Sequence, residues 1–172
     1  MFLEEIKVIE TSPCLANEKL FKGLTRASVS LTELLPYLNA VVEKSNYQPS
    51  SNSFVFKKGI IGFILQDTSI NITQFANITE LYEILDWVKE LINATYESRE
   101  YIEPNYKARK IVPALTIYNL LPKKNCKECG ESTCMAFAAK LNKLDAEIDD
   151  CPLLKKSEYA DLRQKLIKEM DL

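Results

Sequence analysis

The feature that most constrains this chain is a group of four cysteines within residues 121–152. Their spacing is Cys126-x2-Cys129-x4-Cys134-x16-Cys151. Two cysteines separated by two residues lie on one tight turn, and the 16-residue interval before the last is long enough for a helix and a returning loop. Four thiolates at such spacing suit a tetrahedral zinc ion or an iron–sulfur cluster. The segment therefore predicts a metal centre, and the spacing alone leaves both metals open.

Residues 117 to 155 resemble the small four-cysteine [4Fe-4S] domain at the start of the large subunit of the corrinoid iron–sulfur protein. Relatives of that domain occur in the cluster subunit of Rnf-type electron-transport complexes. The positions that carry the resemblance are Asn125, Cys126, Cys129, Gly130, Thr133, Cys134, Met135, Ala136, Phe137, Ala138, Cys151 and Pro152. Lys127 stands where the family usually has a glycine, a change expected to be exposed and to leave the ligands intact. The resemblance covers about a quarter of the chain and implies nothing about the first 110 residues.

The resemblance implies a [4Fe-4S] cluster bound by Cys126, Cys129, Cys134 and Cys151. Zinc is the alternative cofactor, bound by the same four cysteines. A cluster with four thiolates is negatively charged, so nearby positive charge and helix N-termini stabilise it. Lys123, Lys124 and Lys127 flank the first two cysteines, and a helix is expected to begin near Thr133 with side chains that cover the cluster. Those side chains are Met135, Phe137, Ala138 and Leu141.

Composition excludes several classes of protein. A chain of 172 residues fits one domain or one domain with a small module, and 47% hydrophobic residues argues against disorder. The net charge of −2 argues against a nucleic-acid-binding protein. The sequence has no apolar run of about 18 residues and no signal-peptide pattern at its start. We therefore expect a cytoplasmic protein without a membrane span, in which clustered cysteines indicate a metal and not disulfides.

The chain contains no histidine. Its absence excludes His-based acid–base catalysis, Ser-His or Cys-His nucleophile pairs and His-ligated metals. The carboxylates Glu80, Glu83, Asp86 and Glu90 have the spacing of a solvated helix face, which is no catalytic arrangement. Whether the protein is an enzyme is left open, with an electron-transfer or accessory protein favoured.

The first 100 residues are predicted to form a small α+β domain. A short strand is expected near Phe2 to Ile9, followed by a turn at Ser12-Pro13. Alternating apolar and polar residues over 26–32 predict a strand, and Thr32 is expected to cap a helix over 33–42, with Pro36 in its first turn. Residues 44–53 are expected to be a polar loop.

A three-stranded meander should follow. Residues 54–57 and 60–65 around Lys58-Gly59 predict a β-hairpin, and residues 69–73 predict its third strand. An amphipathic helix is expected from Thr79, with Trp87 beside its apolar stripe as a packing residue. The resulting order is strand, helix, meander, helix, with the helices on one face of the sheet. Cys14 is expected to be a semi-buried thiol, with a redox role near the cluster as the alternative.

The expected organisation has four parts. They are an α+β domain at 1–100, a connector at 101–120, a mostly helical [4Fe-4S] module at 121–155 and a C-terminal helix at 156–172. The connector is locally basic and is interrupted by Pro104 and Pro113. The tail has Leu162, Leu166, Ile167 and Met170 at helical spacing.

Four cysteine ligands would complete the coordination of the irons, which favours one-electron transfer over cluster-based catalysis. The expected function is an accessory electron carrier of anaerobic metabolism, with a corrinoid link that the resemblance suggests. Its redox partner would be a ferredoxin-like donor or a corrinoid protein. The alternative is a non-catalytic, partner-binding or redox-sensing module in which a cluster or zinc stabilises the fold.

Overall fold

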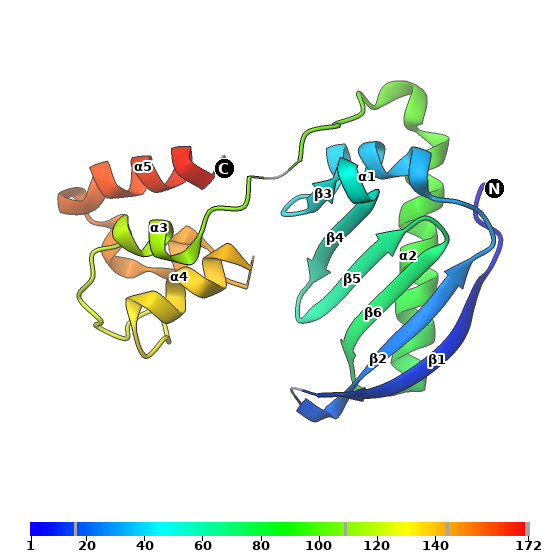
Figure 1. Cartoon of the computed structure of the whole chain (residues 1–172), viewed down its shortest axis with the longest axis horizontal. Coiled ribbons are helices and arrows are strands. Elements are labelled where there is room, and N and C mark those ends of the chain that lie inside the picture. The colour runs from blue at the N-terminus through cyan, green and yellow to red at the C-terminus, as the bar shows by residue number, and fades with distance from the viewer. Residues whose placement is uncertain (16, 109, 144, 171–172) are drawn as a thin grey trace. The chain divides into compact units, whose positions relative to one another are not determined.

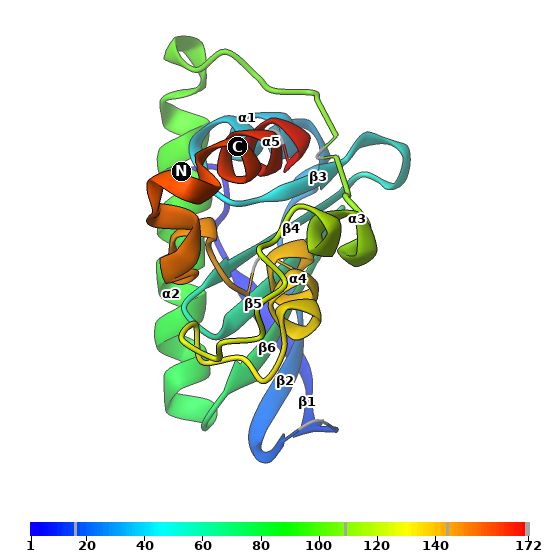
Figure 2. The same cartoon turned by 90° about the vertical axis from the view of Figure 1, so that its left-hand side faces the viewer.

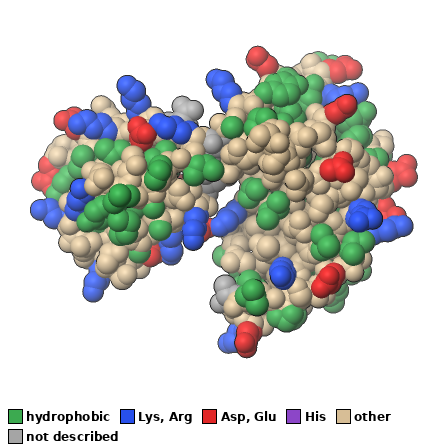
Figure 3. Space-filling model, viewed as in Figure 1, with side chains coloured by type: hydrophobic (Ala, Val, Ile, Leu, Met, Phe, Trp, Pro, Cys, Tyr) green, Lys and Arg blue, Asp and Glu red, His purple; other side chains and the backbone are tan. Residues whose placement is uncertain are grey.

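The computed structural model describes residues 1–15, 17–108, 110–143 and 145–170 (Figure 1). Two compact units divide the chain, Met1–Arg109 and Lys110–Leu172, and each is described by itself. Within the described residues, no helix is long and apolar enough to cross a membrane. Acidic and basic side chains are interspersed on the face of each unit that Figure 3 shows.

The first unit is built on a six-stranded antiparallel sheet. The strands are β1 (Ile6–Cys14), β2 (Asn17–Ala27), β3 (Asn46–Gln48), β4 (Ser53–Lys58), β5 (Ile61–Gln66) and β6 (Ser69–Phe75). Their order across the sheet is β1-β2-β6-β5-β4-β3, so β4, β5 and β6 form a meander and the long hairpin β1–β2 joins its β6 side (Figure 1). The unit also contains η1 (Thr32–Leu34), α1 (Leu35–Val41), η2 (Pro49–Ser51), α2 (Ile78–Glu97) and η3 (Arg99–Tyr101).

The core lies between the sheet and α2, which runs along one sheet face in both views (Figures 1 and 2). Alternate residues of the meander point into this core because successive strand side chains face opposite ways. They are Phe54, Phe56, Phe63, Leu65, Ile70 and Ile72. The apolar stripe of α2 covers them with Leu81, Ile84, Leu85, Val88 and Ile92. Trp87 packs on Phe63, with 5.6 Å between ring centroids, as predicted for an anchoring residue.

The predicted α+β class is confirmed, with helices and an antiparallel sheet in the first unit and a C-terminal helix in the second. The hairpin around Lys58-Gly59 is confirmed as β4–β5, and Gly59 has the positive φ, +61°, that its turn requires. Pro36 lies in the first turn of α1, where its missing N–H is tolerated.

The strand predicted over 26–32 is wrong, because β2 ends at Ala27 and the chain then bends. Leu31 is fully buried, so the predicted burial of the apolar residues in this segment is correct at this position. Its N–H, however, donates to Asp67 O at the β5–β6 turn, 2.9 Å away, and not to a ladder partner. Thr32 caps no helix: it is the first residue of η1, and the N-cap, Leu31, makes no side-chain hydrogen bond.

Two other local predictions need correction. The turn predicted at Ser12-Pro13 lies inside β1, which continues to Cys14. Pro13 is tolerated there because β1 is an edge strand, where a missing N–H need not break a ladder bond. The polar loop predicted at 44–53 contains β3 and η2, with Tyr47 buried in the core.

The second unit is a small helical cluster. Its elements are α3 (Ala114–Asn119), α4 (Cys134–Asn142), η4 (Ile148–Asp150), η5 (Pro152–Lys155), η6 (Ser157–Tyr159) and α5 (Ala160–Met170). Leu166 and Met170 of α5 are buried against the other elements, so the amphipathic C-terminal helix is confirmed. An ion pair between Lys110 Nζ and Glu169 Oε1, 2.7 Å apart, joins the start of the unit to its last helix.

Candidate metal centre

All four cysteines of the motif line one pocket of the second unit. Cys126 and Cys129 come from the loop between α3 and α4, Cys134 is the first residue of α4, and Cys151 follows η4. Their exposure is graded, since Cys126 is exposed, Cys129 and Cys134 are half-buried and Cys151 is buried. The structure thus brings together the four residues that the spacing selected.

The loop before α4 has an unusual backbone. Lys123, Asn125, Lys127 and Gly130 all have positive φ values, between +48° and +81°. Gly130 N donates to Lys127 O at 3.0 Å and closes the turn that joins Cys126 to Cys129. Left-handed residues reverse the chain sharply, which places both cysteines of the turn at the same pocket.

Asn125 connects the two sides of the pocket. Its side-chain oxygen accepts a hydrogen bond from Cys134 N at 2.8 Å, and its own N–H donates to Cys134 Sγ at 3.4 Å. The first of these bonds satisfies an N–H of the first turn of α4 that has no partner within the helix. Sequence reasoning recorded Asn125 only as part of a resemblance, whereas the geometry shows how it positions Cys134.

Lys127 adopts a left-handed backbone with φ of +64° and is exposed. Such a conformation is unfavourable for a residue with a Cβ atom and costs nothing sterically for glycine. We expect Lys127→Gly to raise the free energy of unfolding of the second unit by about 1 kcal/mol. Urea denaturation of the anaerobically purified protein measures this change.

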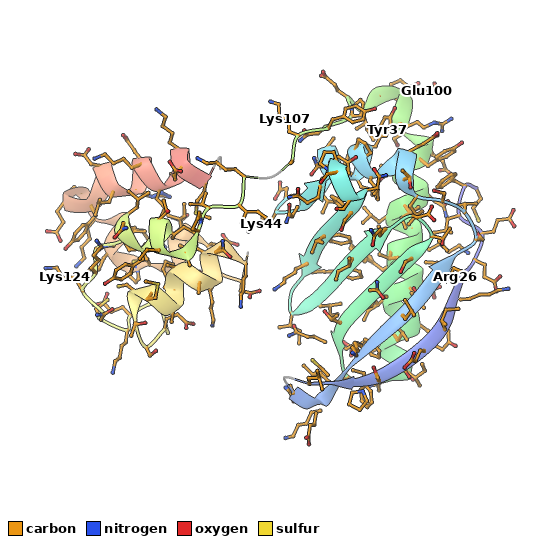
Figure 4. All side chains as sticks on the ribbon, in the orientation of Figure 1. Arg26, Tyr37, Lys44, Glu100, Lys107 and Lys124 are labelled. Carbon is orange, nitrogen blue, oxygen red and sulfur yellow. The ribbon has the colours of Figure 1, made fainter. Side chains whose placement is uncertain are left out.

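Lys124→Gly is the matched control, because Lys124 is also an exposed lysine of this loop but is not among the residues with positive φ (Figure 4). It removes the same charge and adds the same flexibility to the unfolded chain, so it should destabilise by about 0.5–1 kcal/mol. Equal effects of the two substitutions would show that backbone strain at Lys127 is not the cause.

Cys134 lies at the N-terminus of α4, as predicted. The N-cap Thr133 accepts a hydrogen bond from Ala136 N through its side-chain oxygen, at 3.1 Å. The N-terminal end of a helix carries partial positive charge. Sequence and structure therefore agree that Cys134 lies at the positive end of α4.

Cys151 is held by a different local structure. A capping box precedes it, in which Glu147 N donates to Asp150 Oδ2 at 2.8 Å. Burial raises the pKa of the Cys151 thiol, whereas N–H groups of Leu154 and Leu153 lower it by donating hydrogen bonds to the sulfur. Negative charge on Cys129 and Cys126 raises the pKa further. Backbone donors at η5 thus face a buried sulfur, as they do around metal-bound thiolates.

Apolar side chains close the pocket. Phe137 lines it and is 2% exposed, as its place on α4 predicted, and Leu121 and Leu153 line it as well. Sequence reasoning missed these two leucines, because nothing in their spacing distinguishes a pocket-lining from a core position. Met135 is 39% exposed and does not line the pocket, while Ala138 and Leu141 belong to the core behind it.

Charged side chains lie around the pocket. Glu131 lines it and pairs with Lys140, an ion pair that raises the lysine pKa. Lys123 donates to Asn119 Oδ1 at 3.1 Å and lies 5.1 Å from the centre of the Tyr118 ring. Lys124 is exposed and extends from the loop (Figure 4).

The four cysteines share one pocket. In the described part of the chain, no group of three or more His, Cys, Asp or Glu side chains is arranged to hold one metal ion. A tetrahedral zinc site needs all its sulfurs about 2.3 Å from one atom. In a cluster, by contrast, each thiolate binds a different iron, so the sulfurs lie farther apart. The four cysteines that line the pocket are a donor set of the kind that either group needs.

Cys14 is not part of this pocket. It is the last residue of β1 in the first unit, and its side chain is half-buried. The prediction of a semi-buried thiol is confirmed at this position, and the four other cysteines account for the candidate centre.

Comparison with known proteins supports the assignment of this segment. Residues 121–153 match the family described as "Putative Fe-S cluster". The acetyl-CoA decarbonylase/synthase complex subunit gamma of Methanocaldococcus jannaschii is 48% identical over 59 residues, and that of Methanothermobacter thermautotrophicus is 51% identical over 55 residues. The corrinoid/iron-sulfur protein large subunit of Moorella thermoacetica is 58% identical over 38 residues. No solved structure matches the chain.

The matches cover only part of each protein. They include 34%, 32% and 22% of this chain and span 12%, 11% and 8% of the respective relatives. The family match, at residues 121–153, lies in the cysteine-containing segment of the second unit. Residues 121–153 thus match an iron–sulfur domain family, and the chain is similar in part to the corrinoid/iron-sulfur protein large subunit and to the gamma subunits.

Proposed function

We propose that the second unit binds a [4Fe-4S] cluster through Cys126, Cys129, Cys134 and Cys151, and that the protein is an accessory one-electron carrier. The observation that carries this proposal is that the four cysteines line one pocket, within a segment that matches an iron–sulfur family. A cluster of this kind, when bound, gains and loses one electron at low potential. Its four protein ligands would leave no iron open to a substrate.

The chain's own residues fit that role. N–H groups of Asn125, Leu153 and Leu154 donate to cysteine sulfurs, which stabilises negative charge on them. Phe137 and the apolar side chains beside it keep water from the buried side. The exposed side, at Cys126, is the route by which an electron would enter or leave.

The partner we propose is a redox protein, either a ferredoxin-like donor or a corrinoid protein, in the cytoplasm of an anaerobe. The names of the relatives support this choice, because two are subunits of an acetyl-CoA decarbonylase/synthase complex and a third is a corrinoid/iron-sulfur protein. The chain spans about an eighth or less of their length, so a catalytic role is not carried over.

A second candidate function is a structural or redox-sensing module. It is favoured by the way the four cysteines join three separate segments of a small unit, the α3–α4 loop, α4 and the η4–η5 junction. Small domains commonly need such a link, because their hydrophobic cores are limited. Zinc or a cluster could supply it.

Metal analysis of the anaerobically purified protein tests both candidates. The proposal expects about four irons and four sulfides per chain, a visible band near 400 nm that bleaches with dithionite, and an EPR signal of the reduced form. Rapid reduction by a ferredoxin would support electron transfer. One zinc ion without sulfide would overturn the proposal of an iron–sulfur cluster. A cluster that no protein donor reduces would contradict electron transfer and support the structural or redox-sensing role.

A further inference from the structure

The first unit contains a large hollow that is separate from the cysteine pocket of the second unit. It has a volume of about 1080 Å³ and lies where the N-terminus, α1, β3 and the end of α2 meet. Five aromatic residues line it: Phe2, Tyr37, Tyr47, Tyr96 and Tyr106. Small-molecule sites are typically concave, rich in aromatic side chains and supplied with a few polar groups. This hollow has all three features.

Part of its wall is an ordered stack of flat groups. The rings of Phe2 and Tyr96 stack, with 4.1 Å between centroids and 11° between planes. The Arg99 guanidinium lies 3.8 Å from the centre of the Tyr96 ring. Stacking fixes the orientation of these side chains. Another flat group can therefore pack against them with little further loss of side-chain conformational entropy.

Arg99 supplies the positive charge of the hollow. One of its N–H groups donates to Tyr96 O at 2.6 Å, at the end of α2, and it is half-buried. Within the described residues, no carboxylate forms an ion pair with it. A guanidinium has five N–H donors, so a fixed Arg99 keeps several for a ligand. Paired donors in one plane recognise carboxylate and phosphate.

Phenol groups also line the hollow. Tyr47 is 4% exposed, and burial together with the nearby Tyr106 phenol raises its pKa, so it stays protonated and can donate a hydrogen bond. Tyr106 belongs to residues 102–108, here called the strap. Asn105 N donates to Pro36 O at 2.9 Å, and Asn39 Nδ2 donates to Asn105 O at 2.8 Å. The strap is thereby held against α1, beside Tyr37 (Figure 4).

We propose that this hollow binds a small ligand with a flat aromatic ring and an anionic group. The ring would pack among the aromatic side chains, and the carboxylate or phosphate would bind Arg99. The hollow also has one carboxylate, Glu33, but that side chain is exposed at the rim and does not pair with Arg99. Positive charge therefore lies at the Arg99 end of the site.

Binding of three probes to the full chain tests this proposal. AMP and FMN carry a heteroaromatic ring and a phosphate, and 4-hydroxybenzoate carries a ring and a carboxylate. Isothermal titration calorimetry should show saturable binding of about one molecule per chain for at least one probe. Adenosine or riboflavin, which lack the anion, and inorganic phosphate, which lacks the ring, should bind more weakly. Absence of saturable binding by all three probes would overturn the proposal.

Substitutions locate the site. Arg99→Gln should weaken binding about 10- to 100-fold, because it removes a charge-assisted hydrogen bond. Arg26→Gln, the same change on an exposed residue of β2, should leave the affinity unchanged (Figure 4). Tyr37→Leu should weaken binding about threefold to tenfold, and Tyr82→Leu, at a 56% exposed position of α2, should not.

Ligand binding to the hollow is expected not to require the iron–sulfur cluster of the second unit. A variant that loses affinity but keeps its thermal unfolding midpoint and its visible band places the ligand in the hollow. Equal loss of binding in Arg99→Gln and Arg26→Gln would instead show a non-specific charge effect and would overturn the assignment.

Discussion

Replacing Cys151 by serine is expected to leave the purified protein without its iron–sulfur cluster. Cys151 is 6% exposed and comes from the segment after α4, whereas the three other cysteines lie in the loop before α4 or at its start. A serine hydroxyl is a much poorer iron ligand than a thiolate, and two N–H groups that face the sulfur would lose their charged acceptor. Iron should fall from about four atoms per chain to near zero, with loss of the band near 400 nm.

Cys14→Ser is the matched control for this experiment. It makes the same chemical change at the cysteine of β1, which does not line the pocket. Iron and sulfide content should then equal those of the unmodified protein. If Cys14→Ser lost the cluster and Cys151→Ser kept it, the ligand set proposed here would be wrong.

The candidate site could be predicted from the sequence because its ligands are chemically rare and closely spaced. Cysteine spacing and the start of a helix near Thr133 are local features, and the structure places the four cysteines at one pocket and begins α4 at Cys134. Asn125 and Leu153 could not be assigned in the same way. Their roles depend on which side chains a left-handed loop and η5 bring together, and the identity of these residues does not determine that arrangement.

The fold of the first unit was predicted where periodicity and turn residues agreed. The hairpin at Gly59 and the long helix α2 have both signals. The wrong predictions rested on only one of these two features, either periodicity or a turn residue. Residues 28–31 alternate in polarity, yet the chain bends after Ala27, and Leu31 N donates to Asp67 O at the β5–β6 turn, outside any strand ladder. Pro13 marks a turn in most contexts, but an edge strand accommodates it.

Phe137→Ala is expected to give the largest loss of stability in the second unit. Phe137 is 2% exposed and contacts both the core of the unit and the cysteine pocket. Truncation of a buried phenylalanine typically costs about 3–5 kcal/mol, from lost burial and the cavity left behind. That is a large fraction of the stability of a small unit. Met135→Ala, on the same helix but 39% exposed, should change stability by less than about 0.5 kcal/mol.

Two spectroscopic signals separate the effects of Phe137→Ala on the two units. The protein has one tryptophan, Trp87, and it packs on Phe63 in the first unit, so its fluorescence reports unfolding of that unit. The visible band reports the cysteine pocket. In urea, Phe137→Ala should lose the band at a lower concentration while the fluorescence transition stays in place. If both transitions moved together, the two units would unfold as one, and the stability of the pocket would depend on the sheet as well as on its own core.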